Sequence, residues 1–337
     1  MEEQRTPEFQ QPIHPVFARN RVDVSKVQAM VAAIKEQLHK VVIGQDEVME
    51  LLLASLFVEG HVLMEGVPGT AKTLTARLIA QTIATDFSRI QFTPDLMPSD
   101  VVGTSVFNLK TSEFTFNPGP IFANIVLIDE INRSPAKTQA ALFEVMEEQQ
   151  VTIDGKTYTM FAPFFVVATQ NPVEQEGTYR LPEAQLDRFL FKIIMHYPDR
   201  AQEKAILVRY QNDFRMRQQT EVEAVCTPTD IEVCRSLVEQ VFIEDKLLDY
   251  IADIIQSTRS SDDLYLGASS RASLALMKAA KAIAAIDGRD FVTPDDIQRI
   301  VYPVLNHRVI LTPEREMEGF STRDVLETII KKLEVPR

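Results

Sequence analysis

The chain has little cysteine and no tryptophan: Cys226 and Cys234 are its two thiols in 337 residues. Two cysteines are too few for a disulfide framework, and no Cys or His lies nearby at the spacing of a zinc site. We interpret both cysteines as thiols that pack between helices. No apolar run approaches the ~18 residues that a membrane-spanning helix needs. The first residues also lack the cationic and apolar regions of a signal peptide. The sequence therefore predicts a cytoplasmic protein with no membrane span.

Positive charge is scarce as well, since 48 acidic residues against 35 basic ones give a formal net charge of −13. This balance disfavours a broad surface for nucleic acid or for an anionic membrane. An apolar content of 45% over 337 residues is still enough for a sizeable core in about two domains. Nucleic acid is therefore not the expected partner of this chain.

The segment from Gly66 to Thr73 predicts a loop that binds phosphate between a strand and a helix. The glycines allow close backbone N–H groups, Lys72 supplies a cation, and the Thr73 hydroxyl can bind a metal ion. Ala71 departs from the general pattern, which has glycine before the lysine, so an ordinary Gly/Pro turn is the alternative. The predicted nucleotide contacts are Gly66, Val67, Pro68, Gly69, Thr70, Ala71, Lys72, Thr73 and Leu74.

A second motif runs from Ile125 to Glu130, where four apolar residues precede two carboxylates. The carboxyl end of a strand is where an open α/β sheet binds its ligand. Asp129 is predicted to hold Mg²⁺ together with Thr73, and Glu130 to polarise the water that attacks the γ-phosphoryl group of a bound nucleotide. Alone, the segment could be a solvated acidic turn, but with the loop at 66–73 it predicts hydrolysis.

Three further polar residues are candidates for catalysis. Asn171 follows an apolar strand and can hydrogen-bond the attacking water or the γ-phosphate. Arg188 precedes another strand, and Arg271 stands at a helix start in the second half of the chain. Either guanidinium could neutralise charge on a transferring phosphoryl group, although a surface ion pair is the alternative for each arginine alone.

Short apolar runs alternate with helical stretches up to residue 198, which predicts a parallel sheet with helices on both faces. The predicted strands are 62–64, 89–92, 125–128, 164–168 and 189–195. Intervals 100–122 and 151–163 are predicted to be hairpin inserts, and the second contains an Asp-Gly turn. Whether these inserts decorate an edge or contact a substrate is open. The predicted parts are an extension at 1–22, an α/β domain at 23–198 and an all-helical domain at 199–337.

Several of these segments together resemble the AAA+ ATPases, and in particular the MoxR group. The resemblance runs from about Val41 to the final helices, and Ala71 before Lys72 is usual in that group. The segments that carry it are 66–73, 89–100, 125–130, 167–171, 181–189 and 267–271.

The resemblance implies a five-stranded αβα P-loop domain followed by a helical lid, with ATP bound between subunits of a ring that commonly has six members. The resemblance implies that Lys72 and Thr73 belong to Walker A, Asp129 and Glu130 to Walker B, and Asn171 to sensor 1. It implies that Arg188 is the arginine finger for the neighbour's ATP and that Arg271 is the sensor 2 arginine. Val42, Ile43 and Gly44 are the implied adenine contacts. Intervals 100–122 and 151–163 correspond to the helix 2 insert and the pre-sensor 1 hairpin.

The expected function is an Mg²⁺-dependent ATPase that remodels partner proteins like a chaperone, or assists their assembly or metal insertion. The resemblance implies a von Willebrand factor A domain protein as partner. A nucleic-acid motor is the alternative, because related helix 2-insert rings include helicases, but the net charge of −13 and the absence of an extended basic tract oppose it. A nucleotide-gated switch with little turnover is a third possibility, which Glu130 and Arg188 oppose.

Overall fold

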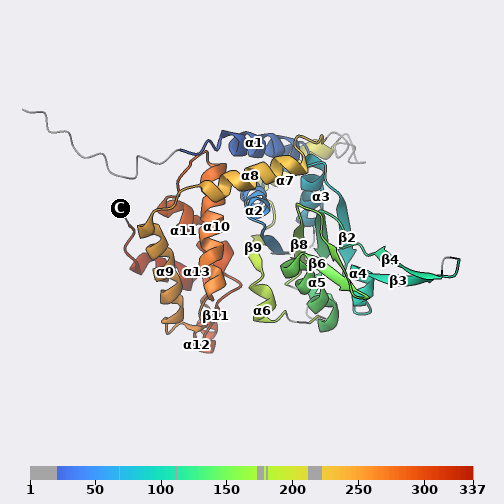
Figure 1. Ribbon diagram of the computed structural model, residues 1–337. Coiled ribbons are helices and arrows are strands. Elements are labelled where there is room, and N and C mark those ends of the chain that lie inside the picture. Colours follow the sequence, from blue (N-terminus) through green and yellow to red (C-terminus); the bar gives the residue numbers. More distant parts are fainter. Residues whose placement is uncertain are drawn as a thin grey trace, which may run out of the picture.

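The computed structural model describes residues 21–67, 69–110, 112–172, 178–179, 181–211 and 222–336. An α/β domain and a helical lid lie side by side (Figure 1). Pro68 and most of the predicted extension, residues 1–20, lie outside the described residues, and the domain boundaries near 22 and 198 stay a prediction. No helix in the described part of the chain is both long and apolar enough to cross a bilayer.

The α/β domain contains one five-stranded sheet in which all neighbouring strands are parallel. The strand order is β2 (Phe87–Gln91), β5 (Ile125–Asp129), β8 (Phe165–Gln170), β1 (His61–Gly66) and β9 (Phe189–Met195). Every residue of β5 is buried, as expected for a strand covered on both faces. The predicted sheet is confirmed, and its carboxyl edge brings the ends of β1, β5 and β8 together.

Helices cover both faces of the sheet, so the domain has three layers. Alternate residues of β5 enter different cores because a strand has a period of two. Ile125 and Leu127 belong to the core of α1 (Ser25–His39), α2 (Asp46–Phe57) and α3 (Lys72–Thr82). Val126 and Ile128 belong to the core of α5 (Ala136–Glu148), a helix that the sequence patterns do not predict. Shorter elements are α4 (Pro98–Val102), η2 (Ile131–Arg133) and α6 (Glu183–Leu186).

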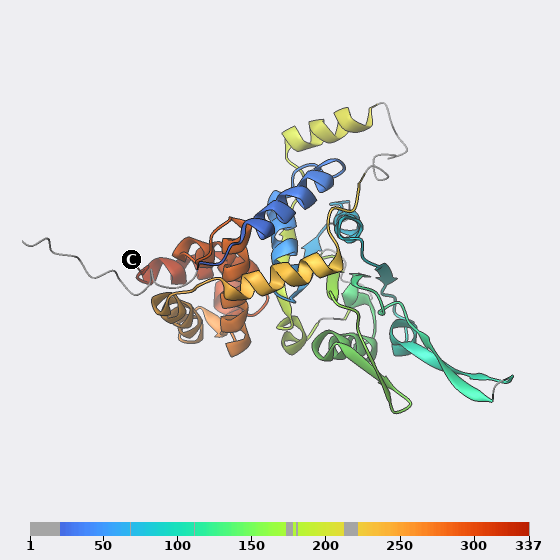
Figure 2. The ribbon, with the colours of Figure 1, turned by 45° about the horizontal axis from the view of Figure 1, so that its top comes forward.

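Two antiparallel hairpins project from the α/β domain on the same side (Figure 2). They are β3 (Gly103–Asn108) with β4 (Glu113–Pro118), and β6 (Gln150–Ile153) with β7 (Lys156–Thr159). Asp154 and Gly155 both have positive φ, 52° and 75°, which is the turn that Asp-Gly favours. Each hairpin falls on one of the two intervals predicted as inserts but is shorter than that interval. Helix α4 occupies the start of the first interval, and neither strand pair extends to the end of its interval.

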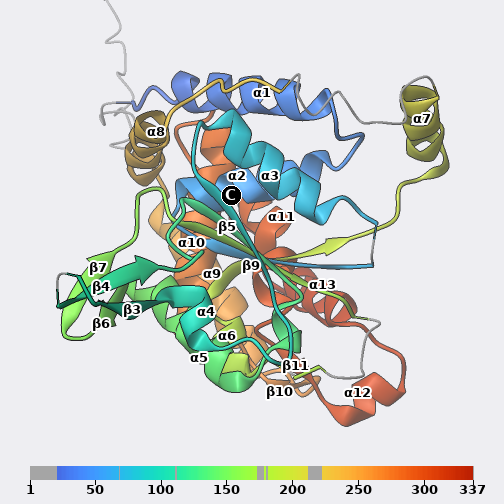
Figure 3. The same ribbon diagram turned by 90° about the vertical axis from the view of Figure 1, so that its right-hand side faces the viewer.

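From residue 228 on, the described part of the lid contains six helices: α8 (Pro228–Gln240), α9 (Asp245–Arg259), α10 (Ser270–Ile286), α11 (Pro294–Leu305), α12 (Pro313–Met317) and α13 (Thr322–Lys332). It is helical as predicted, but not entirely, because β10 (Leu264–Leu266) pairs with β11 (Ile310–Leu311). Strands of three and two residues are too short to give a detectable period. Helix α7 (Arg200–Tyr210), at the start of the predicted helical domain, lies near the end of α1 (Figure 3).

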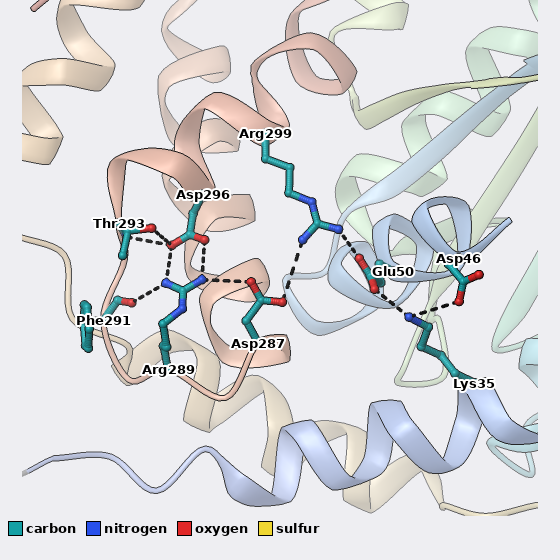
Figure 4. A network of polar contacts seen from close by, with 9 residues as sticks. All are labelled: Lys35, Asp46, Glu50, Asp287, Arg289, Phe291, Thr293, Asp296 and Arg299. Carbon is teal, nitrogen blue, oxygen red and sulfur yellow. Dashed lines mark hydrogen bonds and ion pairs between the residues drawn. The ribbon is translucent and has the colours of Figure 1, made fainter. Parts of the chain in front are cut away.

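The lid shares a continuous apolar core with the helices that precede the phosphate loop. Buried residues of α10 and α11 belong to the same core as those of α1 and α2. An ionic network reinforces this contact (Figure 4). Glu50 of α2 accepts from Lys35 Nζ of α1 at 2.6 Å and also from Arg299 of α11. The lid is thereby joined to α1 and α2 by both apolar and ionic contacts.

Both cysteines are buried thiols. Cys234 packs within α8 as predicted, whereas Cys226 lies just before that helix, with its Sγ 3.6 Å from the carbonyl oxygen of Thr82. Burial raises the pKa of Cys226 to about 12 and that of Cys234 to about 11. Both thiols therefore stay protonated at neutral pH, which fits a packing role.

His61 is a buried imidazole that joins β1 to its neighbours. The Val166 N–H donates to Nδ1 at 3.1 Å, so Nε2 carries the proton and donates to the Met146 carbonyl at 3.1 Å. Burial lowers the pKa of His61 to about 4 from 6.5. Because the folded state resists protonation, the unfolded chain takes up the proton first as pH falls.

We expect His61 to cost the folded state about 3 kcal/mol of stability between pH 6.5 and about 4, with the loss levelling off below that pH, where the folded state also binds the proton. Denaturant titrations at several pH values would measure this loss. His61→Asn should lose stability less steeply across this window than the wild type, while His196→Asn, at an exposed position, should retain the wild-type slope. Equal slopes for His61→Asn and wild type would contradict the assignment.

Candidate functional site

The phosphate loop connects β1 to α3, and its backbone explains the residues found there. A Cβ on Gly66 would lie 2.8 Å from the Met195 carbonyl oxygen, so the close approach of β9 requires glycine. Ala71 has φ 61°, in the left-handed region that glycine adopts without strain. The departure from the general pattern therefore costs about 1 kcal/mol of backbone strain but preserves the loop conformation. The Lys72 ammonium donates to the carbonyls of Gly66 and, at 3.3 Å, Val67, within the loop.

The loop and the carboxylates at the end of β5 line one cleft of about 340 Å³. Its described lining consists of Gly69, Thr70, Ala71, Lys72, Thr73, Leu74, Arg89, Gln91, Asp129, Glu130, Thr169 and Asn171. The structure thus brings together the predicted Walker A, Walker B and sensor 1 residues, which come from the ends of three neighbouring strands. This edge is where a parallel sheet binds its ligand.

Two side chains of β2, neither of which was a predicted site residue, contact the carboxylates. Arg89 Nε lies 2.6 Å from Asp129 Oδ2, and Gln91 Nε2 donates to Glu130 Oε2 at 2.8 Å. Arg89 and Gln91 share a face of β2 because they are two residues apart. Glu130 itself has φ 57°, a left-handed conformation that is rare outside glycine and that often occurs at functional sites.

Thr169, the residue before Gln170 in β8, is a further polar contact that sequence reasoning missed. Its side chain is buried, with 3% of the residue exposed. The Thr169 hydroxyl accepts from the Glu130 N–H at 3.0 Å and donates to Asp129 Oδ1 at 3.2 Å. One hydroxyl therefore fixes the backbone of Glu130 and the carboxylate of Asp129. A polar residue closing an apolar strand was the signal that could have revealed it.

We expect Thr169→Val to lower kcat for ATP about 10-fold with little change in KM, because the isosteric side chain leaves the Glu130 N–H unpaired and Asp129 less fixed. Steady-state ATPase assays would measure both constants. Thr169→Ser keeps the hydroxyl and should recover most of the activity. A Ser variant as impaired as the Val variant would show that the methyl group, and not the hydroxyl, matters.

The predicted adenine segment lines a separate cavity of about 450 Å³. Val42, Ile43 and Gly44 form one side of it, and α7 forms the other with Ala205, Val208 and Arg209. The segment is tied to the phosphate loop, since Gln45 Nε2 donates to the Thr70 carbonyl at 3.0 Å. The contribution of α7 could not be predicted, because no local pattern shows which helix faces residues 42–44.

Arg188 and Arg271 lie close to each other, but neither is among the described residues that line the cleft containing Lys72. Both pair with Glu147, at the end of α5. Arg188 Nη1 lies 2.6 Å from Glu147 Oε2, and Arg271 Nη2 lies 2.5 Å from Glu147 Oε1. The predicted site residues therefore fall into three groups: the cleft with the phosphate loop, the cavity beside Val42, Ile43 and Gly44, and a separate pair of arginines.

Comparisons with known proteins agree with this geometry. The family model of the "ATPase family associated with various cellular activities (AAA)" matches residues 61–191, and the model of the AAA lid domain matches residues 256–329. A crystal structure of a presumed ATPase from Cytophaga hutchinsonii ATCC 33406 superposes with a TM-score of 0.84 and 43% identity, over 93% of this chain and 98% of that one. The fold and the ATPase activity of the family are thereby supported independently.

Two relatives in sequence narrow the family further. The uncharacterized protein YeaC of Bacillus subtilis (strain 168) is 45% identical over 97% of this chain and 97% of its own length. Chaperone MoxR1 of Mycobacterium tuberculosis (strain ATCC 25618 / H37Rv) is 39% identical over 93% of this chain and 84% of its own. This identity extends over nearly the whole chain and agrees with the geometry of the cleft. The protein therefore belongs to the MoxR family of AAA+ ATPases.

Proposed function

We propose that the protein hydrolyses ATP as a ring of identical subunits, commonly six in this family, with each ATP bound between two neighbours. The observation that carries the proposal is the separation of Arg188 and Arg271 from the cleft that contains Lys72 and Glu130. An arginine finger typically contributes about 10³ to 10⁵ to the rate of nucleotide hydrolysis. A neighbouring subunit could supply both arginines to that cleft.

Mg²⁺ fits the oxygen atoms at the end of β5 and the start of α3. The Asp129 carboxylate and the Thr73 hydroxyl line the same cleft, and Mg²⁺ prefers such hard oxygen ligands, completed by water and phosphate. Asp129 and Thr73 would hold the ion, which when bound neutralises charge that develops on the phosphates. Arg89 must first release Asp129 Oδ2, with which it pairs at 2.6 Å.

The remaining residues of the cleft have distinct roles in this proposal. Lys72 binds the β- and γ-phosphates as a point charge. Glu130 orients and polarises the attacking water, and Asn171 donates its amide to that water or to the γ-phosphate. Val42, Ile43 and Gly44 pack against adenine with α7 on the opposite side. Pro68, the remaining predicted contact of the loop, lies outside the described residues.

We further propose that movement between subunits remodels or assembles partner proteins in the cytoplasm. The name of the relative MoxR1, a chaperone, supports protein clients and does not favour the nucleic-acid motor. A von Willebrand factor A domain protein is the partner that the family implies, and metal insertion into a client is one possible outcome of the remodelling. The hairpins β3–β4 and β6–β7 are candidates for contact with the client, since they project from the same side of the domain (Figure 2).

The trans role of Arg188 can be tested by mixing two inactive variants. Arg188→Ala should lower kcat by about 10³-fold, as the loss of a finger does elsewhere. Glu130→Gln subunits cannot hydrolyse their own ATP but retain Arg188. When rings are reassembled from both variants, an Arg188→Ala subunit beside a Glu130→Gln subunit should regain hydrolysis. Mixed rings, verified by mass, that remain inactive would contradict the proposed shared site.

A further inference from the structure

The turn that carries Arg188 is anchored to the lid by a buried ion pair. Arg308 follows α11 and its side chain is 3% exposed, with Nε 2.7 Å from Asp187 Oδ1. Its Nη2 donates to the carbonyls of Asp187 and Phe189 at 3.0 and 2.7 Å, and its Nη1 to that of Leu190 at 3.0 Å. One guanidinium from the lid therefore holds the chain on both sides of Arg188.

The second oxygen of the same carboxylate reaches the helix that carries Arg271. Ser269 Oγ donates to Asp187 Oδ2 at 2.9 Å. Ser269 is the N-cap residue of α10, and Arg271 lies in the first turn of that helix. An N-cap serine normally accepts from an N–H of its own helix, but this side chain makes no capping bond. Its hydroxyl instead connects the start of α10 to Asp187.

Glu147 contacts the guanidinium groups of both arginines. Its two oxygens pair separately with Arg188 and Arg271, so a single carboxylate lies between two guanidinium groups that would otherwise repel each other. Asp187 fixes the backbones that carry the two arginines, and Glu147 fixes their charged ends. The two arginines come from different domains but are held as a pair.

We infer that Asp187, Arg308 and Ser269 are positioning residues, which hold Arg188 and Arg271 as one unit for the ATP of the neighbouring subunit. The inference rests on the proposed function, in which both arginines act in trans. Positioning of this kind matters because a displacement of about 1 Å at a reacting group can cost about 10²-fold in rate. It also assigns the lid a direct part in catalysis by the adjacent subunit.

Asp187→Asn and Ser269→Ala test the inference. Asp187→Asn retains an acceptor oxygen but loses the charge that pairs with Arg308, so kcat should fall about 30-fold with KM for ATP within about 2-fold of wild type. Ser269→Ala removes one hydroxyl at the exposed end of the network and should lower kcat about 5-fold. The serine variant keeps the test informative if the buried pair proves necessary for folding.

Mixed rings separate positioning from general damage. Asp187→Asn subunits retain Lys72 and Glu130, so beside Glu130→Gln subunits, which offer intact arginines, they should regain hydrolysis. A defect of folding would impair their own cleft as well, and no recovery would follow. Asp263→Asn is the matched control, because Asp263 Oδ1 also lies 2.7 Å from an arginine Nε, that of Arg315, elsewhere in the lid; it should leave kcat unchanged.

Two results would overturn the inference. One is wild-type kcat in both Asp187→Asn and Ser269→Ala. The other is failure of the Asp187→Asn mixture to recover while the Arg188→Ala mixture does recover. If neither mixture recovers, the trans role of Arg188 itself is wrong, which identifies the proposed function as the part that fails, and the inference falls with it.

Discussion

Glu130→Gln should keep ATP bound while its hydrolysis falls by at least about 100-fold. The amide has the shape of the carboxylate but cannot polarise water as a base. Binding should change little, because Lys72 and the loop backbone remain, and the oxygen of the new amide can still accept from Gln91, which donates to Glu130 Oε2 at 2.8 Å. Single-turnover hydrolysis together with equilibrium binding of a fluorescent ATP analogue would separate the two effects.

A matched control for this variant is Glu36→Gln, at a position of α1 far along the chain from the cleft. It makes the same chemical change and should retain wild-type turnover. Turnover within about 3-fold of wild type in Glu130→Gln would remove Glu130 from its assigned role. Loss of ATP binding along with hydrolysis would instead indicate that the left-handed backbone at Glu130, φ 57°, depends on the carboxylate.

Lys72→Ala should weaken nucleotide binding, with Kd raised at least about 30-fold, because a charge-assisted contact to phosphate contributes about 2 kcal/mol or more. The ammonium already lies inside the loop, bonded to the carbonyls of Gly66 and Val67, so little reorganisation is needed for it to meet phosphate. Isothermal titration with ATP would measure the loss. The increase in Tm that ATP produces in the wild type should disappear too.

Lys278→Ala, in the lid helix α10, is the control for Lys72→Ala and should bind ATP normally. The melting temperature without nucleotide should be compared as well, since Lys72 also holds the loop carbonyls. Unchanged ATP affinity in Lys72→Ala would mean that the loop does not bind the phosphates. That result would undermine the interpretation of the whole cleft and not only of one residue.

Local patterns predicted the sheet and the cleft well because both depend on short segments. Ile125 to Asp129 is a continuous apolar run ending in a carboxylate, and parallel topology alone then places Asp129 beside the phosphate loop. Ala71 departs from the motif, and its φ of 61° shows why glycine is usual at this position.

The parts that could not be predicted depend on contacts between distant segments. Glu147 meets Arg271 from 124 residues away, and Arg308 meets Asp187 from 121 residues away. No local period or motif indicates contacts between residues so far apart in the chain. The sequence therefore predicted that Arg188 and Arg271 act on nucleotide, but not that they share Glu147. The same reason applies to α7 beside Gly44. The boundaries of the domains stay a prediction.

The joint between the lid and helices α1 and α2 bears on how force could be generated. Apolar side chains of both parts occupy one core, and Glu50 ties Lys35 of α1 to Arg299 of α11 across it. A hinge there would have to expose that core and break these charges. We therefore expect each subunit of the proposed ring to move as a rigid body. The amplitude of the movement would then be set at the interfaces between subunits. At these interfaces Arg188 and Arg271 would leave Glu147 and pair with the phosphate of the neighbour's ATP.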